Sequence, residues 1–464
     1  MESENKIVKQ VNGFGGISFV MAKMKQLGIP ELFDSMLGTR VKQARYSYSD
    51  VFLGWVYCNL CGAKRIEDIY TENLHNTFQQ IPIAKLCSPD SVGRIFKRFA
   101  TPADKHLHKH KKNTTGHEFN SNSLINDLLL QFSKSVGVLK ESESYLLDFD
   151  ATMIPTEKAD AKLTYKEFRG YSPSIGMIGK LPVFIEGRNG NSPASYRAAA
   201  ALAEMYERLQ HNGINTWGIR MDAAYYQLDI IDLLVAKQQK FYIRATNTDE
   251  KKSDFNIGQY RKAELENRPY DQIANVEFEP FKDRPAFRFV ILRRLKRELE
   301  EERKKLKKLG RESELGEPKP EDYVVRAIIT NDMEKYRAPL TGERKYVRSD
   351  EDVVRLYDLR GDAENNFRDL LNDFNWRRVP FQNMNENLVF MYVSAMAKIL
   401  FEYLLQQFAD NTAAFQEKVK LKKFVAYFVR RVAVQWLQQG DGWTLELLNL
   451  KEKFEALQSW AVRK

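Results

Sequence analysis

Apolar and polar residues over the first hundred positions follow the three- and four-residue spacing of amphipathic helices. The segment SPDSVGRIFKRFA shows this pattern clearly, and either Ser88 or Asp90 can serve as its N-cap. Its apolar face comprises Val92, Ile95, Phe96 and Phe99. The pattern predicts a helical N-terminal region, which together with a following linker spans residues 1–125.

From residue 144 the pattern changes to strand-forming segments. YLLDFDATMI, YKEFRGYSPSIGMIG and KLPVFIEGR are rich in strand formers and are separated by Gly and Pro. A helix opened by Ser192 and Pro193 follows in SPASYRAAAALAEMYERLQ, then the strand NTWGIRMD, the helix YYQLDIIDLLVAKQ and the strand KFYIRAT. This order is that of a ribonuclease-H-like α/β domain, whose first part we place at residues 126–246.

Residues 247–345 are more than such a domain needs, so we expect an inserted domain there. The strand-like pieces IANVEFEPF, AFRFVILRRL and YVVRAIITN predict that this insert is β-rich. Between them runs LKRELEEERKKLKKLG, whose basic and acidic residues at helical spacing are typical of a solvated, self-paired helix. Contact with a DNA backbone is the alternative for this charged helix.

Residues 346–410 are expected to complete the α/β domain, and residues 411–464 to form a helical C-terminal region. The most apolar stretch, LVFMYVSAMAKILFEYLL, contains Lys398 and Glu402. Charged residues at those positions favour a buried helix over a membrane span, so no membrane partner is expected.

Composition narrows the class of protein. The 464 residues are 43% hydrophobic and 12% aromatic, enough for a sizeable core in two to four domains, and the formal charge of +10 favours an anionic partner such as nucleic acid. Three cysteines give no disulfide framework, and the N-terminus MESENKIVKQVNGFGG has no apolar signal core. We therefore expect a cytoplasmic protein. Cys58 and Cys61 form a lone CxxC in an apolar run, which predicts buried thiols.

The segment HLHKHKKNTTGHEFNSNS interleaves histidines with lysines and turn formers, and its composition predicts a linker. The alternating histidines lack the paired spacing of structural zinc sites, so phosphate contact or plain solvation is preferred over metal binding. These histidines are His106, His108, His110 and His117.

Three basic residues, Arg94, Lys97 and Arg98, would lie on the outward face of the helix in SPDSVGRIFKRFA. A basic helix after a short turn fits the second helix of a helix-turn-helix that lies in a DNA groove. An ordinary amphipathic helix with a solvated basic face fits the same residues equally well.

Three acidic residues stand at the edges of predicted elements: Asp150 in YLLDFDATMIP, Asp222 in WGIRMDAAYY and Glu364 in YDLRGDAENNFRDLL. Taken singly, each has an ordinary explanation as a strand end, a turn former or a helix-start charge. Taken together, such carboxylates can share divalent metal, and two Mg²⁺ ions about 4 Å apart would clamp the attacking and leaving oxygens of a phosphoryl transfer. Asp148 shares the strand face of Asp150, so periodicity does not choose between them.

The last of these segments continues as YDLRGDAENNFRDLLNDF. Tyr357, Arg360 and Glu364 follow one another at steps of three and four, which places them on one face if the segment is helical. An apolar stripe adjoins this face, formed by Phe367, Leu370, Leu371 and Phe374.

The stretches LDFDAT, RGYSPSIGMIGKLPVFIEGRNGN and RMDAAY, with the Tyr357, Arg360, Glu364 spacing, resemble the DDE transposases of bacterial insertion sequences. The resemblance covers roughly residues 145 to 400 and is closest to the cut-and-paste group with a Y, R and E signature. It implies that the catalytic, metal-binding acids are Asp150, Asp222 and Glu364. The alanine and threonine that follow Asp150 match the family motif, which favours it over the other aspartate of that strand.

The resemblance implies Mg²⁺ as cofactor, which Mn²⁺ can replace, and hydrolysis at the element end followed by attack of the freed 3′-hydroxyl on target DNA. Tyr357 and Arg360 would hold DNA phosphates. One departure is Leu371, which stands where the family signature has a lysine. That phosphate contact is therefore expected from another basic residue, namely Arg368, Arg377 or Arg378.

Double-stranded DNA is then the expected partner, both as terminal inverted repeats and as target. The resemblance also implies a homodimer that bridges two element ends in a bacterial cytoplasm, at the nucleoid, and a DNA hairpin intermediate whose flipped base the insert helps to hold. Two alternatives remain from the residues themselves. One is a ribonuclease-H-like nuclease that cuts without joining, and the other is a DNA-binding protein whose acids are unused.

Overall fold

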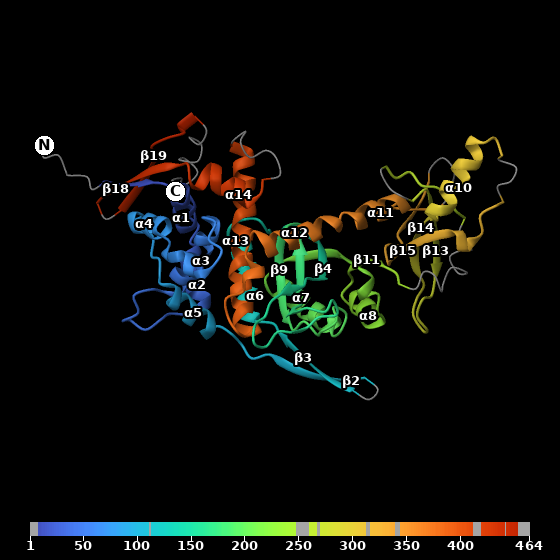
Figure 1. Ribbon diagram of the computed structural model, residues 1–464, viewed down its shortest axis with the longest axis horizontal. Helices are drawn as coiled ribbons and strands as arrows, with labels where there is room; N and C mark the ends of the chain where they lie inside the picture. The colour runs from blue at the N-terminus through green and yellow to red at the C-terminus, as the bar shows by residue number, and fades with distance from the viewer. Residues whose placement is uncertain are drawn as a thin grey trace.

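A computed structural model describes residues 8–110, 113–246, 259–266, 270–311, 316–338, 344–411, 419–440 and 442–452. Figure 1 shows an elongated molecule with a sheet and its helices in the middle. The N-terminal helices and the last two strands lie together at one end, and the segment between β11 (Lys240–Arg244) and α11 (Asp350–Asp358) lies at the other. The chain therefore crosses its whole length and returns.

The main sheet is built around β4 (Ser144–Ala151). On one side β4 pairs antiparallel with β8 (Ser174–Ile178), which pairs antiparallel with β9 (Leu181–Arg188). On the other side β4 pairs in parallel with β10 (Asn215–Met221), and β10 in parallel with β11 (Lys240–Arg244). The predicted α/β class and the predicted order of these elements are confirmed.

Helices cover both faces of this sheet because its strands bury apolar side chains on both sides. α7 (Ala198–His211) and α8 (Leu228–Ala236) pack on one face with Leu147, Phe149 and other residues of one core. α6 (Ser123–Ser135) and α13 (Met384–Asn411) pack on the other in a second core. α7 begins later than its predicted start at Ser192, because Arg197, the residue before Ala198, is left-handed with φ of 56°.

The N-terminal region is helical, as predicted. Its helices are α1 (Gly16–Gln26), α2 (Ile29–Leu37), α3 (Tyr48–Leu60), η1 (Ile66–Tyr70), α4 (Glu72–Gln80) and α5 (Pro89–Arg98). Of the two candidate caps of α5, Ser88 serves, because its side chain accepts a hydrogen bond from the Ser91 amide. Cys58 and Cys61 are buried in this region, as expected of core thiols. Burial raises the pKa of both.

Within its described part, the predicted helical C-terminal region is helical only from Leu421 to Val429, and the prediction is wrong from Ala433 onward. Beyond the short helix α14 (Leu421–Phe424), the chain forms a hairpin of β18 (Ala433–Gln439) and β19 (Gly442–Leu447). β1 (Val8–Asn12) pairs antiparallel with β18 and completes a three-stranded sheet. The physical reason is alternation: Val434 and Trp436 are buried in the same core as the N-terminal helices, whereas Ala433, Gln435 and Leu437 are only partly buried, a period of two that no helix satisfies. Residues 412–418 and 453–464 lie outside the described part.

The histidine-rich segment is a β-hairpin and not a linker. β2 (Asp104–His110) pairs antiparallel with β3 (Asn113–Asn120), and β3 continues into the main sheet beside β9. The prediction failed because lysines and turn formers dominate the composition, whereas alternation places His106 and His108 on one face of a strand. β2 and β3 thus belong structurally to the main sheet.

The segment between β11 and α11 extends the sheet to eleven strands. β15 (Tyr323–Thr330) pairs antiparallel with β11, then with β14 (Phe287–Leu295), β13 (Gln272–Phe278) and β12 (Arg261–Lys262). β16 (Lys335–Arg337) and β17 (Arg344–Tyr346) form a separate hairpin. The charged run forms α10 (Arg297–Lys308), which buries none of its residues, as expected of a solvated helix.

The chain returns through two consecutive helices, α11 (Asp350–Asp358) and α12 (Gly361–Asn372), a short turn η5 (Trp376–Arg378) and then α13. One helix of the described residues, Met384–Ala409, is long and apolar enough to cross a membrane, and 89% of its most apolar window is buried in the protein. Lys398 lies within it, completely buried, and pairs with Glu402 at 3.0 Å. It is a core helix, as predicted. Three two- or three-residue strands form a side sheet, namely β5 (Ile154–Pro155), β6 (Lys162–Leu163) and β7 (Arg169–Tyr171).

Candidate active site

Two of the predicted acids stand at the carboxyl ends of neighbouring parallel strands. Asp150 is the seventh residue of β4, and Asp222 directly follows β10. The register pairs Arg220 with Asp148, so its continuation by two residues sets the two acids opposite each other. Backbone amides hold both: the Ala151 amide donates to Asp150 at 2.8 Å, and the Ala224 amide donates to Asp222 at 2.9 Å.

The third acid comes from the return helices. Glu364 lies in the first turn of α12, and Arg360 stands at the break between α11 and α12. The Arg360 guanidinium donates to the Asp150 carboxylate and lies 3.9 Å from an oxygen of Asp222 and 3.8 Å from an oxygen of Glu364. One cation thus draws together carboxylates from three elements that are far apart in sequence. All three predicted acids therefore lie within 4 Å of one guanidinium.

The electrostatics of this cluster are unbalanced. Burial raises the pKa of Asp150 to about 6, the Arg360 guanidinium opposes that rise, and the nearby Asp222 and Glu364 carboxylates add to it. The three acids and one guanidinium sum to two negative charges when all are ionised. Glu364 is open to solvent, with 66% of its side chain exposed, so the cluster can be reached from outside.

Asp148 has a different environment, which separates it from Asp150. Its carboxylate accepts two hydrogen bonds from Arg220, at 2.8 and 2.6 Å, and both side chains are buried. The remaining terminal nitrogen of Arg220 donates to the Leu356 carbonyl of α11 at 2.7 Å. Nothing in the sequence pattern singled out this arginine. It links β4, β10 and α11 at a position two residues before Asp150 and Asp222.

The other predicted residues of the return segment differ in exposure. Tyr357 is buried and its ring lies 4.9 Å from the Arg326 guanidinium, in a small core of the insert strands. Burial raises its pKa. Because α11 ends at Asp358 and α12 begins at Gly361, Tyr357 and Glu364 belong to two helices, while the Arg360 guanidinium lies close enough to Tyr357 to oppose the rise of its pKa. Three further basic residues are exposed, namely Arg368, Arg377 and Arg378.

In the N-terminal region the outward basic face of α5 is present. Arg94, Lys97 and Arg98 are all exposed. Lys97 lies 3.9 Å from Glu386 at the start of α13, and Arg98 lies over the Tyr48 ring. This face belongs to the N-terminal helices, whereas the acids stand at the end of the main sheet, so the two groups of site residues are separate.

The donor set of the acids suits a divalent metal, since three carboxylates offer the oxygen ligands that Mg²⁺ takes. Their convergence on one guanidinium shows that a single cation can be reached from all three. Within the described ranges, however, no group of three or more acidic, histidine or cysteine side chains stands close enough to hold an ion as arranged.

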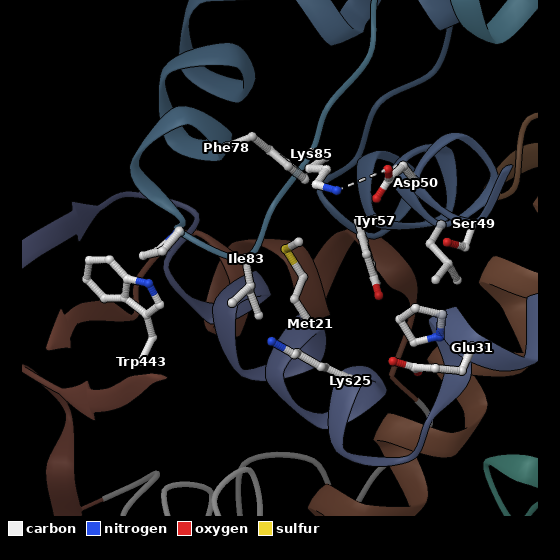
Figure 2. Close-up of a pocket in the computed structure, with 14 residues that line it drawn as sticks. Met21, Lys25, Glu31, Ser49, Asp50, Tyr57, Phe78, Ile83, Lys85 and Trp443 are labelled. Atoms are coloured by element: carbon white, nitrogen blue, oxygen red, sulfur yellow. Dashed lines mark ion pairs between the residues drawn. The ribbon is translucent and has the colours of Figure 1, made fainter. Parts of the chain in front are cut away.

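A pocket of about 370 Å³ lies elsewhere, between the N-terminal helices and β19 (Figure 2). Figure 2 shows Tyr57 and Met21 pointing into it, Trp443 at its rim, and Lys85 paired with Asp50 at 3.7 Å. Its walls include none of the three candidate acids, so it is separate from the acid cluster.

The family model for the transposase DDE domain, group 1, matches residues 9–425. No curated protein matches the chain significantly in sequence. Among solved structures, the cryo-EM structure of a piggyBac transposase synaptic complex with hairpin DNA is similar with a TM-score of 0.39 and 9% identity, over 91% of this chain and 82% of that chain. Because the family model spans most of its length, this chain belongs to the DDE transposases.

Proposed function

We propose that this transposase cuts DNA at the ends of an insertion sequence and joins those ends to target DNA at the cluster of Asp150, Asp222 and Glu364. The observation that supports this assignment most directly is the Arg360 guanidinium, which lies within 4 Å of all three carboxylates. Acids from three elements around one cation are the arrangement that metal-dependent phosphoryl transfer needs.

The catalytic domain is, in this proposal, ribonuclease-H-like. The strand order β9, β8, β4, β10, β11, with the first pairs antiparallel and the last two parallel, supports it. In parallel strands, the residues that follow the carboxyl ends gather at one edge, where ligands bind. This is the edge at which Asp150 and Asp222 stand.

Mg²⁺ or Mn²⁺, when bound, would supply the charge that activates the attacking oxygen and neutralises the phosphate. Asp150, Asp222 and Glu364 would hold it. Arg360 balances the acids in its absence, and once released it is placed to hold a DNA phosphate with its planar fork. Tyr357 would support the turn between α11 and α12 from the small core of the insert strands. Arg368, on the exposed face of α12, would contact the DNA backbone.

Further parts of the proposal follow from the resemblance to bacterial insertion-sequence transposases of the Y, R and E group. They are a homodimer that bridges two terminal repeats and a location at the bacterial nucleoid. Arg94, Lys97 and Arg98 are proposed to read the repeats, and their exposure supports that role.

The test is incubation of the purified chain, with Mg²⁺ and separately with Mn²⁺, with DNA that carries the flanking repeats of its own gene and a target plasmid. Cleavage at the repeat ends together with joined products supports a transposase. Cleavage without joining identifies a nuclease, and binding without cleavage under either metal identifies a non-catalytic DNA-binding protein.

A second readout is the melting temperature. Metal that binds only the folded state stabilises it by about 2.7 kcal/mol at a concentration one hundred times its Kd. The wild-type protein should therefore melt higher with Mg²⁺, in the presence of DNA, and a variant with all three acids neutralised should not. Equal shifts in both proteins would place the metal elsewhere.

A further inference from the structure

The β2–β3 hairpin leaves the main sheet at the edge that carries the acids. β3 pairs with the last two residues of β9, Gly187 and Arg188. The neighbouring pairs lead across β8 to Ala151, the residue after Asp150. Because β3 is antiparallel to β9, its residues before Phe119 lie beyond this edge, and Figure 1 shows the hairpin projecting from the molecule.

The distance between the hairpin and the acids is short on the scale of DNA. Three strand spacings of about 4.8 Å separate β3 from β4, which is roughly 14 Å across the sheet. One turn of a DNA duplex is about 34 Å long. A duplex held at Asp150 therefore passes the root of the hairpin within half a turn.

One face of the hairpin is held in place by the segment that follows β9. The ring of Tyr196 lies 4.8 Å from the rings of both His108 and His117. Arg197 contacts His106 at 2.9 Å between nitrogen atoms. These tilted ring contacts and this polar contact hold in place a two-stranded element that would be marginal by itself.

The other face is open. Leu107 is 73% exposed, and the residue opposite it in β3 is Gly116, which offers no side chain to cover it. Lys105 stands two residues away on the same face with 77% of its side chain exposed, at 3.5 Å from Glu118. The fold thus holds a free apolar side chain and a cation outward on a supported ribbon.

We infer that this open face is a DNA-binding surface, with Lys105 contacting a phosphate and Leu107 entering a groove beside the cleaved bond. The inference rests on the proposed function, because it takes the acids as the place where DNA is cut. A two-stranded ribbon fits the major groove, and apolar side chains on such elements also insert between base steps in the minor groove.

The first test places a photocrosslinker at position 107 by the substitution Leu107→p-benzoylphenylalanine in the full chain, with Leu309→p-benzoylphenylalanine as control. Leu309 is similarly exposed, at 67%, but lies at the end of α10 in the insert. We expect position 107 to crosslink to the DNA end within one turn of the cleaved bond. Crosslinks from position 107 to a second copy of the chain, or none to DNA, would overturn the inference.

The second test measures binding of the same DNA without divalent metal. Lys105→Ala combined with Leu107→Ser should weaken binding about five- to tenfold and lower the slope of log K against log salt by about one, the value for one phosphate contact. The matched pair Lys308→Ala with Leu309→Ser should stay within twofold. Equal affinity of the hairpin variant and wild type overturns the inference.

Failure of the inference and failure of the proposed function remain distinguishable. If wild type cleaves the element ends but the hairpin variants bind and crosslink no differently from their controls, only the inference is wrong. If wild type never cleaves, the proposed function is wrong.

Discussion

Two arginine–carboxylate clusters are built on β4 and β10, two residues apart along each strand. They differ in the charge that they leave unbalanced. The lower one pairs Arg220 with Asp148 through two aligned hydrogen bonds, is buried, and is electrically neutral. The upper one sets Arg360 against three carboxylates, two of them near 4 Å, and reaches solvent through Glu364.

Under the proposed function, the upper cluster carries the chemistry and the lower cluster is structural. The Arg220–Asp148 ion pair is neutral and attracts no further cation, whereas the three acids beside Arg360 retain two negative charges. β4 and β10 therefore carry both a buried, neutral ion pair and, two residues further along, a negatively charged edge that attracts further cations. Substitutions in the two clusters should accordingly fail in different ways, the upper in activity and the lower in stability.

The largest effect is expected in the upper cluster. Asp150→Asn, Asp222→Asn and Glu364→Gln each remove one charged ligand with little change of shape, so each should abolish cleavage while DNA binding persists. The loss should exceed the roughly 10²- to 10³-fold cost of removing one transition-state hydrogen-bond donor. Gel assays of cleavage and of binding on the same DNA would check this. Loss of binding with any of these variants would mean that the residue is structural.

In the lower cluster the expected effect is on stability. Asp148→Asn leaves the Arg220 charge buried without its counter-ion, a change that typically costs about 3–5 kcal/mol. Urea denaturation of this variant should show that loss, and its cleavage should persist at temperatures where it stays folded. The double variant Asp148→Leu with Arg220→Met should be more stable than Asp148→Asn alone. An inactive but fully stable Asp148→Asn would reverse the assignment of the two aspartates.

A smaller effect is expected from pH. The pKa of Asp150 is raised from 3.8 to about 6 in the folded state, chiefly by burial. A raised folded-state pKa means that the contribution to stability is present below pH 4 and is lost as pH rises through 6. Without metal, the stability of wild type should therefore fall between pH 4 and 7 relative to Asp150→Asn, by up to about 2–3 kcal/mol. Parallel stability curves for the two proteins would show that Asp150 is not titrating in this range.

The sequence was sufficient for the order of helices and strands from β4 to β11. Strand-forming runs and strong helix signals alternate there, so the order of elements could be predicted. The choice of Asp150 over Asp148 needed a motif, because period two makes them equivalent. The physical reason to choose Asp150 comes from the register alone, which pairs Arg220 with Asp148.

The rest could not be predicted because it depends on contacts distant in sequence. The strand β18 is recognisable once β1, more than four hundred residues earlier, is known to pair with it. The histidine hairpin is supported by Tyr196 and Arg197, which follow a different strand. Neither partner is visible from local composition, which is why one segment was predicted to be helical and the other a linker.

The smallest effect is expected from the basic face of α5, and contacts distant in sequence also decide how it must be tested. Since β1 pairs with β18, a fragment of residues 1–125 lacks part of its own sheet, and the test requires the full chain. Replacing Arg94, Lys97 and Arg98 by alanine removes at most three phosphate contacts, so the salt slope should fall by up to about 2.7 for duplex DNA.

Because these side chains are exposed, the melting temperature should hardly change, and stabilisation of the triple variant by metal should equal that of wild type. Affinity for the terminal repeat should fall more than affinity for random DNA if this face reads sequence, and both should fall alike if it only holds the backbone. Competition binding at two salt concentrations separates these outcomes. An unchanged affinity for both DNAs would move recognition of the element end away from α5.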